Sequence, residues 1–175
     1  MEVWRGSQEG LSVVIINPGV ILGPGFWGTG SGVLFTTAYK AYSFYPPGGT
    51  GFITVQDVIK MMTTLMDSQI KNERFIAVAE NLSFQEILIR LTQEFGKPAP
   101  RKKLKYWQLE IGRIVDFIWT VLSGNPRSIT KSSIYSMKHR DLYNNHKTIE
   151  VLGFVFAPLD PTLTFASRLF LQENL

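Results

Sequence analysis

The sequence predicts an α/β fold in which the edge of a parallel sheet carries a mainly helical cap. Three short apolar segments lie within the first 79 residues and are separated by helical patterns. The first, Leu11–Ile16, has five apolar residues in six, most of them β-branched, which is typical of a strand buried on both faces of a parallel sheet. Beyond residue 80 the pattern is mainly helical, so a partial sheet with a helical cap fits better than a self-sufficient sheet.

The composition is that of one globular domain. The chain has 175 residues, is 45% hydrophobic and 18% charged, and contains no cysteine. Disordered and collagen-like classes are excluded, as are disulfides, thiolate metal sites and cysteine nucleophiles. No apolar run approaches the roughly 18 residues that a membrane span requires, and the first ten residues do not resemble a signal peptide. We therefore expect a cytoplasmic protein.

The chain is predicted to begin with the end of a helix. Met1–Gln8 has a helical pattern, and Glu9-Gly10 ends it because glycine adopts the left-handed conformation at little cost. A chain rarely begins with two helical turns and no cap, so we expect this helix to continue from an amino-terminal portion outside the sequence. The predicted strand Leu11–Asn17 follows and ends at Pro18-Gly19.

The next segments repeat the alternation of helix and strand. A helix is predicted over Ser31–Phe44, with Ser31 as its cap, and a short strand over Phe52–Val55. The clearest helix begins at Thr54, whose spacing to Asp57 matches a capping box. Its apolar stripe is interpreted as core packing rather than as an adaptable binding surface, and consists of Val58, Met61, Met62, Leu65 and Met66.

The third predicted strand, Arg74–Ala79, leads to a helix that Ser83 and Glu86 cap with the same spacing. The basic stretch Lys97–Lys105 follows this helix and accounts for much of the net charge of +4. It contains two prolines and lacks the interleaved aromatic residues of a nucleic-acid interface, so we interpret it as a solvated connector and expect no nucleic-acid partner.

The later part of the chain is predicted to be helical with interspersed loops. Tyr106–Leu122 has apolar residues at helical spacing and carries Trp107 and Trp119. A helix lying on a membrane surface is one interpretation, but Glu110 and Asp116 favour a helix packed on the domain. From Ser128 onward helix and loop alternate, and a last helix opens at Asp160-Pro161.

The two histidines do not form a recognisable metal site. His139 and His146 are seven residues apart, without the i, i+3 or i+4 spacing of a metal pair and without a nearby set of carboxylates. We interpret them as ordinary surface residues and expect no bound metal.

The glycine-rich stretch after the first strand contains a G-x-G-x-x-G pattern over Gly23–Gly28. A dinucleotide fingerprint also requires an acidic residue about 20 positions later, and none occurs between Glu9 and Asp57. Pro18 and Pro24 also remove backbone donors from the turn. This pattern is therefore not interpreted as a phosphate loop, although a glycine loop at the carboxyl end of a buried parallel strand is where such sheets bind ligands.

The segment Asn17–Gly25, N-P-G-V-I-L-G-P-G, resembles the extended short-chain dehydrogenase/reductase superfamily. The similarity is to its NAD-dependent epimerase/dehydratase group, near dihydroflavonol reductases and 3β-hydroxysteroid dehydrogenases. Further motifs occur in the order that family uses, namely Glu9-Gly10-Leu11, Phe52–Val58, Glu80–Phe84, Lys147 and Leu152-Gly153-Phe154. The resemblance covers essentially the whole chain, but only the carboxyl-terminal half of such a protein.

The resemblance implies the edge of a Rossmann-type parallel sheet with a mainly helical substrate-binding cap. Residues 1–10 would be the tail of the catalytic helix, 11–60 the end strands of the sheet with the cofactor and substrate loop, and 61–175 the mainly helical part. NAD or NADP would be the cofactor, held by Pro18, Gly19, Val20 and Ile21 at the nicotinamide and by Ser31 at a phosphate. The implied substrate-binding residues are Phe26, Trp27, Tyr45 and Gly49.

In this family hydride passes between NAD(P) and a ketone or secondary alcohol, with a Tyr-x-x-x-Lys pair as the acid/base group. This chain lacks that pair on the helix before the first strand, and it lacks the glycine-rich phosphate loop. Tyr143 and Lys147 have the required spacing but lie far from the cofactor loop in sequence, at a position similar to a structural lysine in relatives. We therefore assign no catalytic residue.

The resemblance also implies partners. The chain alone is expected to be inactive, and its partner would be the missing amino-terminal Rossmann half, with a small-molecule ketone or secondary alcohol as substrate. The open edge of Leu11–Asn17 would also allow a homodimer to form. The alternative function is a non-catalytic cap module that contacts a protein or a membrane surface through Tyr106–Leu122.

Overall fold

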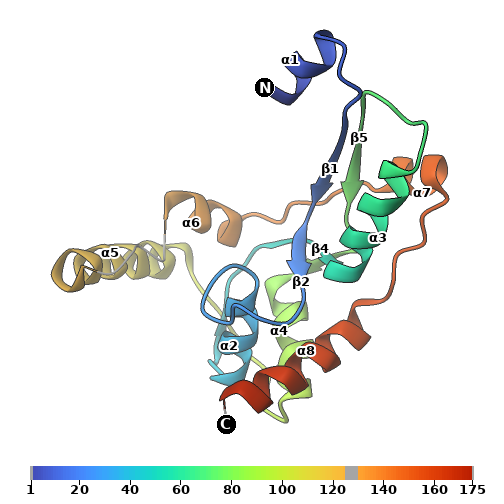
Figure 1. Ribbon diagram of the computed structural model, residues 1–175. Helices are drawn as coiled ribbons and strands as arrows, with labels where there is room; N and C mark the ends of the chain where they lie inside the picture. Colours follow the sequence, from blue (N-terminus) through green and yellow to red (C-terminus); the bar gives the residue numbers. More distant parts are fainter. Residues whose placement is uncertain (1, 125–129, 175) are drawn as a thin grey trace.

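The computed structural model describes residues 2–124 and 130–174 (Figure 1). Met1 and Ser128, which begin two of the predicted segments, lie outside these residues. The elements follow in the order α1 (Glu2–Gln8), β1 (Val14–Pro18), β2 (Val20–Leu22), α2 (Gly32–Tyr39), β3 (Phe44–Tyr45), β4 (Gly49–Thr54), α3 (Val55–Met66), β5 (Glu73–Ala77), β6 (Glu80–Ser83), α4 (Phe84–Glu94), β7 (Lys102–Lys103), α5 (Tyr106–Ser123), α6 (Lys131–Lys138), α7 (His146–Leu152) and α8 (Leu159–Asn174).

The strands form parallel pairs, as an α/β fold requires. β1 pairs in parallel with β5, from Val14 opposite Glu73 to Pro18 opposite Ala77. β2 continues from β1 after Gly19 and pairs in parallel with β4, whose other edge pairs antiparallel with β6. The two-residue strands β3 and β7 form a further parallel pair. The predicted α/β fold is confirmed. The strand β6 was not predicted, because the helical pattern that begins at Ser83 directly follows it.

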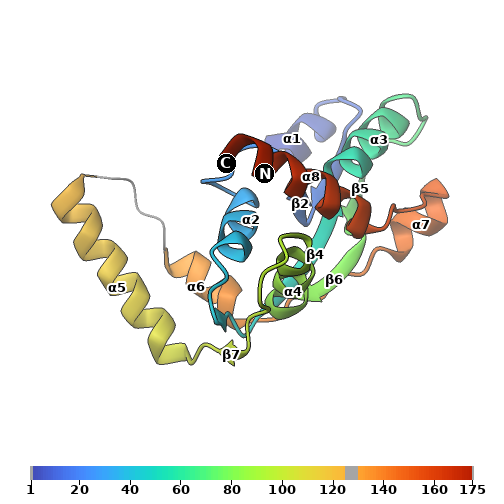
Figure 2. The same ribbon diagram turned by 90° about the horizontal axis from the view of Figure 1, so that it is seen from below.

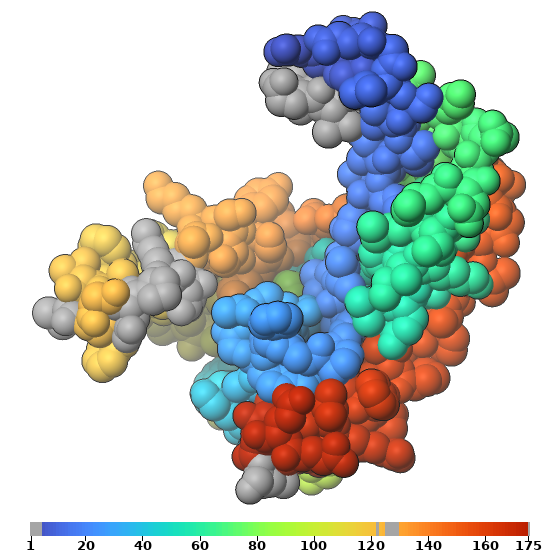
Figure 3. Space-filling view, in the orientation of Figure 1, coloured from blue at the N-terminus to red at the C-terminus, as the bar shows by residue number. Residues whose placement is uncertain are grey.

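The burial predicted for the first strand is wrong. Val14 to Ile16 are only half-buried, and Asn17 and Pro18 are exposed. Within the described residues β5 is the neighbour of β1 on one edge, and the other edge is unpaired. In Figure 3 the surface is hollowed along β1, between α1 and α6. Among the described residues, the apolar run of β1 therefore has a neighbouring strand on one edge only.

Two hydrophobic clusters hold the fold together. The larger lies between the β2–β4–β6 sheet and helices α2, α4 and α8, and Phe35 and Phe52 at its centre are fully buried. The smaller lies between α3 and the strands β4 and β5, around Phe75 and Met61. Helix α8 lies against α4, β2 and β4, and α5 lies apart from it at the left of Figure 2. Both clusters draw on segments far apart in the chain.

Two helix starts follow their sequence patterns. The Thr54 hydroxyl accepts a hydrogen bond from the Asp57 amide at 3.0 Å, although the Asp57 carboxylate accepts from the Ala157 amide instead of completing a box. At α4 the box is complete, with Ser83 and Glu86 each accepting from the other's backbone amide. Ser31 precedes α2 but makes no side-chain cap bond. That helix ends at Tyr39, earlier than predicted, because Ala41 adopts a φ of +52°.

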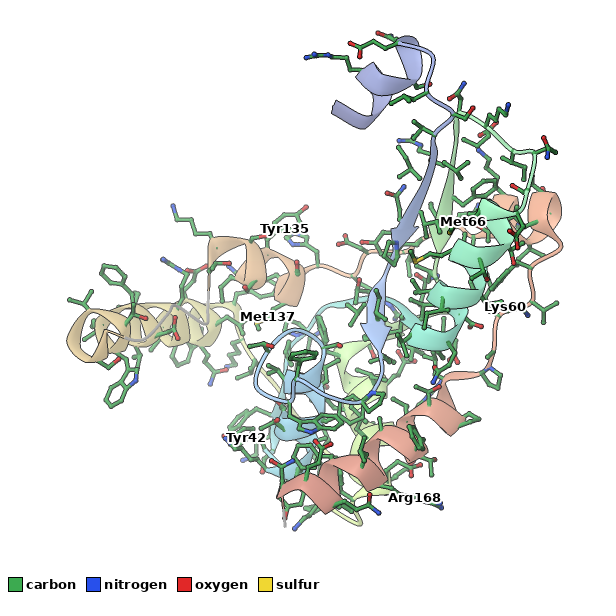
Figure 4. All side chains as sticks on the ribbon, in the orientation of Figure 1. Tyr42, Lys60, Met66, Tyr135, Met137 and Arg168 are labelled. Carbon is green, nitrogen blue, oxygen red and sulfur yellow. The ribbon has the colours of Figure 1, made fainter. Side chains whose placement is uncertain are left out.

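The methionine stripe of α3 is only partly core. Met61 is fully buried and Leu65 nearly so, which confirms the packing interpretation for these positions. Met62 is 49% exposed and Met66 is 81% exposed (Figure 4), so the interpretation is wrong for them. Within the described residues, β1 and β5 therefore cover only part of the apolar stripe of α3.

We predict that Ser83→Ala lowers the free energy of unfolding by about 1 kcal/mol, since it removes the N-cap of α4. The Ser83 hydroxyl and amide hold the pKa of Glu86 below its ordinary value of 4.5. This part of the stability is therefore complete above pH 4.5 and is lost as the pH falls through the lower folded-state pKa. Urea unfolding at neutral and acidic pH measures both effects, and Ser136→Ala, at an exposed position within α6, is the control. A Ser83 variant as stable as the parent at neutral pH contradicts the prediction.

The prediction that helix α5 packs on the domain is wrong for most of its length. Figures 1 and 2 show it extending away from the sheet, with α6 as its neighbour. Trp107 is 59% exposed and Trp119 is 65% exposed. In the described part of the chain no helix is long and apolar enough to cross a membrane.

Candidate functional site

A cavity of about 510 Å³ lies where β1 passes into β2. Of the five residues predicted to hold the cofactor, four line it: Gly19, Val20, Ile21 and Ser31. Pro18, the fifth, is an exposed residue at the end of β1 and is not among the lining residues. The other lining residues are Gly30, Leu34 and Phe84. None of these side chains carries a charge.

Gly19 positions this cavity. Its amide donates to the Ala77 carbonyl at 3.0 Å, which ties the junction between β1 and β2 to the end of β5. A Cβ at Gly19 would lie 2.4 Å from the Gly51 carbonyl oxygen, so the strand β4 passes directly against this position. The lack of a side chain at Gly19 therefore allows the backbone of β4 to approach closely.

A second cavity of about 470 Å³ lies between α2, α4, α5 and α6. Figure 4 shows two of its lining residues, Tyr42 just beyond α2 and Met137 on α6, and Figure 3 shows α2 and the α5–α6 region next to each other on one face. Among the described residues that line this cavity none has a charged side chain. They are Val33, Leu34, Thr37, Tyr42, Phe44, Pro46, Phe84, Leu88, Leu104, Gln108, Leu109, Gly112, Ile134 and Met137.

The two cavities meet at Leu34 and Phe84, which line both. Leu34 lies in the first turn of α2, and Phe84 is the first residue of α4. A molecule at the junction of β1 and β2 would therefore lie next to a molecule in the apolar cavity. The arrangement places a cavity beside glycine-rich backbone next to a cavity lined by apolar side chains.

The predicted substrate-binding residues line neither cavity. Phe26 is 90% exposed with a φ of +52°. Trp27 packs edge-on against Phe35 and Phe170, and its Nε1 donates to Glu173 at 2.6 Å. Tyr45 forms β3 opposite Lys103, and Gly49 is buried in β4. Their role in substrate binding stays a prediction.

Several lining residues escaped the sequence analysis. Val33, Leu34 and Thr37 are spaced so that they share one side of the predicted helix Ser31–Phe44, and that spacing could have identified them. Tyr42 follows α2 and Met137 lies on α6, and these two segments come together only because the chain returns toward α2 after α4. No local pattern marks them.

Tyr143 and Lys147 are held apart from both cavities. The Tyr143 amide and carbonyl each make a 2.9 Å hydrogen bond with the side chain of Asn81. The Lys147 ammonium pairs with the Glu73 carboxylate and lies 5.1 Å from the centre of the Phe75 ring. This lysine holds the pKa of Glu73 below its ordinary value. The contacts are those of a structural lysine that fastens α7 to β5.

The histidines make local contacts. His139 stacks on Tyr135, with 4.1 Å between ring centres. Across residues 2–124 and 130–174 no three His, Asp or Glu side chains lie in an arrangement that could hold a metal ion.

Comparison with known proteins places the chain among oxidoreductase and epimerase folds. No protein-family profile matches it. The chain is 31% identical over 99 residues to sterol demethylase protein B of Methylococcus capsulatus, covering 54% of the chain and 30% of that protein. It is 24% identical over 179 aligned residues to a putative dihydroflavonol 4-reductase of Synechocystis, covering 97% of the chain and 51% of that protein.

Solved structures extend the similarity over nearly the whole chain. A nucleoside-diphosphate-sugar epimerase from Pseudomonas aeruginosa matches with a TM-score of 0.73 and 22% identity, covering 99% of this chain and 52% of the epimerase. This chain therefore spans about half the length of the structures it matches, and a third to a half of the curated relatives. Over about half of that epimerase, the chain has the same Rossmann-type α/β fold.

Proposed function

We propose that this chain is the nicotinamide-closing and substrate-binding half of an NAD(P)-dependent oxidoreductase or epimerase. The observation that carries the proposal is the junction of the two cavities at Leu34 and Phe84. One cavity lies at the carboxyl end of a parallel strand, where such sheets bind cofactors, and the other offers an apolar site beside it. Hydride transfer requires such adjacency of cofactor and substrate.

The lining of the first cavity suits the nicotinamide end of a dinucleotide. NAD or NADPH is present in solved structures with this fold, among them a UDP-glucose 4-epimerase from Thermus thermophilus and a human epimerase family protein. A Cβ at Gly30 would have no heavy atom within 4 Å, so this position leaves room for a flat ring. Ser31 offers a hydroxyl, and none of the described lining residues is an acid that would oppose a phosphate. A bound nicotinamide would supply the hydride donor or acceptor.

The chain's own residues would position the reactants and exclude water. Val20, Ile21 and Leu34 would cover the ring, and the second cavity would hold the apolar body of a ketone or secondary alcohol. No residue here is assigned to proton transfer. The open edge of β1, with the hollow along it in Figure 3, is where the remaining strands of an amino-terminal Rossmann half would be added. We further propose a cytoplasmic location, and pairing of this edge between two copies when that half is absent.

NADPH titrated into the chain alone, and followed by its own fluorescence, is expected to bind weakly or not at all, because the sequence lacks the glycine-rich loop that would bind the phosphates of the dinucleotide. Preceded by an amino-terminal Rossmann half, the same chain is expected to bind NADPH with micromolar affinity and to reduce an apolar ketone such as decalone. Micromolar affinity of the chain alone would place the cofactor site elsewhere.

Two tryptophan substitutions in the complete protein separate the cavities. Ser31→Trp is expected to weaken NADPH binding about tenfold or more, and Met137→Trp to raise the KM for decalone while the Kd for NADPH stays unchanged. Lys40→Trp, at the exposed far end of α2, is the matched control and should change neither constant. Equal effects of all three variants would contradict the assignment of the cavities.

A further inference from the structure

Helix α5 has two unlike sides. Leu109, only 6% exposed, lines the apolar cavity together with Gln108 and Gly112. Roughly opposite Leu109 lies a stripe at positions i, i+4, i+7, i+8 and i+11, which 3.6 residues per turn bring onto one face. We call it the α5 stripe, and it consists of Trp107, Ile111, Ile114, Val115 and Ile118.

The α5 stripe is uncovered in the described part of the chain. Each of its residues is 49–59% exposed. Figure 4 shows the side chains of α5 extending outward from the molecule, and Figures 1 and 2 place α6 on one side of the helix only. Single exposed apolar residues are ordinary, but a continuous stripe along three turns marks a contact surface.

The acidic residues of α5 are paired or lie away from the α5 stripe, and a basic segment precedes the helix. The acidic Glu110 is occupied by Arg113 at 2.9 Å and by Lys138 of α6 at 2.8 Å, so that its charge is compensated on the α6 side. Asp116 lies nine residues after Trp107, half a turn away from the stripe. The segment that enters the helix is strongly basic and exposed, and comprises Arg101, Lys102, Lys103 and Lys105.

From these observations we propose that α5 docks in the plane of an anionic membrane surface. The stripe inserts among the lipid chains, and the basic residues before the helix contact the lipid headgroups. Tryptophan is favoured at the boundary between headgroups and chains, and the stripe begins with Trp107. The helix lies on the bilayer, and its other side brings the apolar cavity next to the membrane. An apolar substrate dissolved in the bilayer then has a short path to the site.

Lipid composition distinguishes this partner from others. The complete protein is expected to co-sediment with vesicles of phosphatidylcholine containing about one third phosphatidylglycerol, and much less with phosphatidylcholine alone. Added salt should release it, because the headgroup contacts are exposed and screened. The emission of Trp107 should shift to shorter wavelength on binding, and Trp107→Phe should remove that contribution without abolishing sedimentation.

Two pairs of variants test the two contributions. Ile114→Asp with Ile118→Asp is expected to weaken binding about 100-fold or more, against Val151→Asp with Val155→Asp as a control at two other exposed valines. Lys102→Gln with Lys103→Gln is expected to weaken binding about 30-fold, against Lys40→Gln with Lys71→Gln. The lysine pairs change only exposed side chains, so they remain informative if an aspartate variant fails to fold.

Three outcomes would overturn the proposal. They are absence of binding to the anionic vesicles, equal binding to both vesicle types, and equal losses in the test and control pairs. Sedimentation velocity without lipid supplies a further test. If the parent protein is a dimer and the Ile114→Asp, Ile118→Asp variant is a monomer, a second copy of the chain covers the stripe and the membrane does not.

Discussion

Phe52→Ala is expected to lower the free energy of unfolding by about 3–5 kcal/mol, the largest effect that we predict for a single substitution. Phe52 is fully buried in β4, at the centre of the larger cluster, between Val20 on β2 and Glu80 on β6. Truncation would leave a cavity in the cluster that helices α2, α4 and α8 form with the sheet. Domains are stable by only about 5–15 kcal/mol, so the loss would be a large part of the total.

Urea unfolding followed by circular dichroism measures this loss. Phe165→Ala is the matched control, since Phe165 is 56% exposed on α8 and the same atoms are removed from water-accessible surface. The control should change the free energy of unfolding by less than about 1 kcal/mol. If both variants lost equal stability, Phe52 would not be the centre of the core.

Gly19→Ala is expected to cost about 3 kcal/mol, at the upper end of the range for overpacking. The new Cβ would lie 2.4 Å from the Gly51 carbonyl oxygen and 2.7 Å from its carbon. Both are backbone atoms in the centre of β4, which pairs on both edges and cannot move aside. The junction of β1 and β2 would shift instead, and with it the walls of the proposed nicotinamide cavity.

The control for this substitution lies in the same glycine-rich stretch. A Cβ at Gly28 has no heavy atom within 4 Å, so Gly28→Ala should leave stability unchanged or raise it slightly by restricting the unfolded chain. Denaturant midpoints of the two variants provide the comparison. A Gly19→Ala protein as stable as the Gly28→Ala protein would show that β4 does not press against the junction.

The cavity geometry also gives the apolar character of the proposed substrate a physical basis. The solved structures of similar fold include an epimerase complex with UDP-glucose from Thermotoga maritima, a substrate that carries charged phosphates. Among the described residues no basic side chain lines the second cavity to meet such charges.

Local patterns predicted the elements that local physics controls. Ser83 and Glu86 form the capping box that their spacing indicated, and Thr54 caps α3. Gly10 has a positive φ at the end of α1, as its position predicted. In the cofactor region Gly19, Val20, Ile21 and Ser31 do line one cavity, but this followed from the family resemblance and not from periodicity.

Where contacts come from distant segments, the sequence was a poor guide. The apolar run of β1 indicated a strand with neighbours on both edges, yet the described chain supplies only β5. The acids of α5 suggested a helix packed on the domain, but Glu110 turns toward Lys138 of α6 and leaves the α5 stripe uncovered. Hydrophobic periodicity predicts which side chains are buried, but it does not identify the surface that buries them.

From its residues alone, this protein has an α/β order of elements, defined helix starts at Thr54 and Ser83, and a glycine-rich turn after its first strand. These features depend on hydrogen bonds and steric limits between residues only a few positions apart, so short sequence patterns predict them. Only the folded chain decided that Leu34 and Phe84 join two cavities, and that one side of α5 faces a cavity while the other faces outward. Such contacts form when segments separated by tens of residues pack together. The burial of apolar surface that stabilises them depends on distant residues, so no short stretch of sequence reveals it.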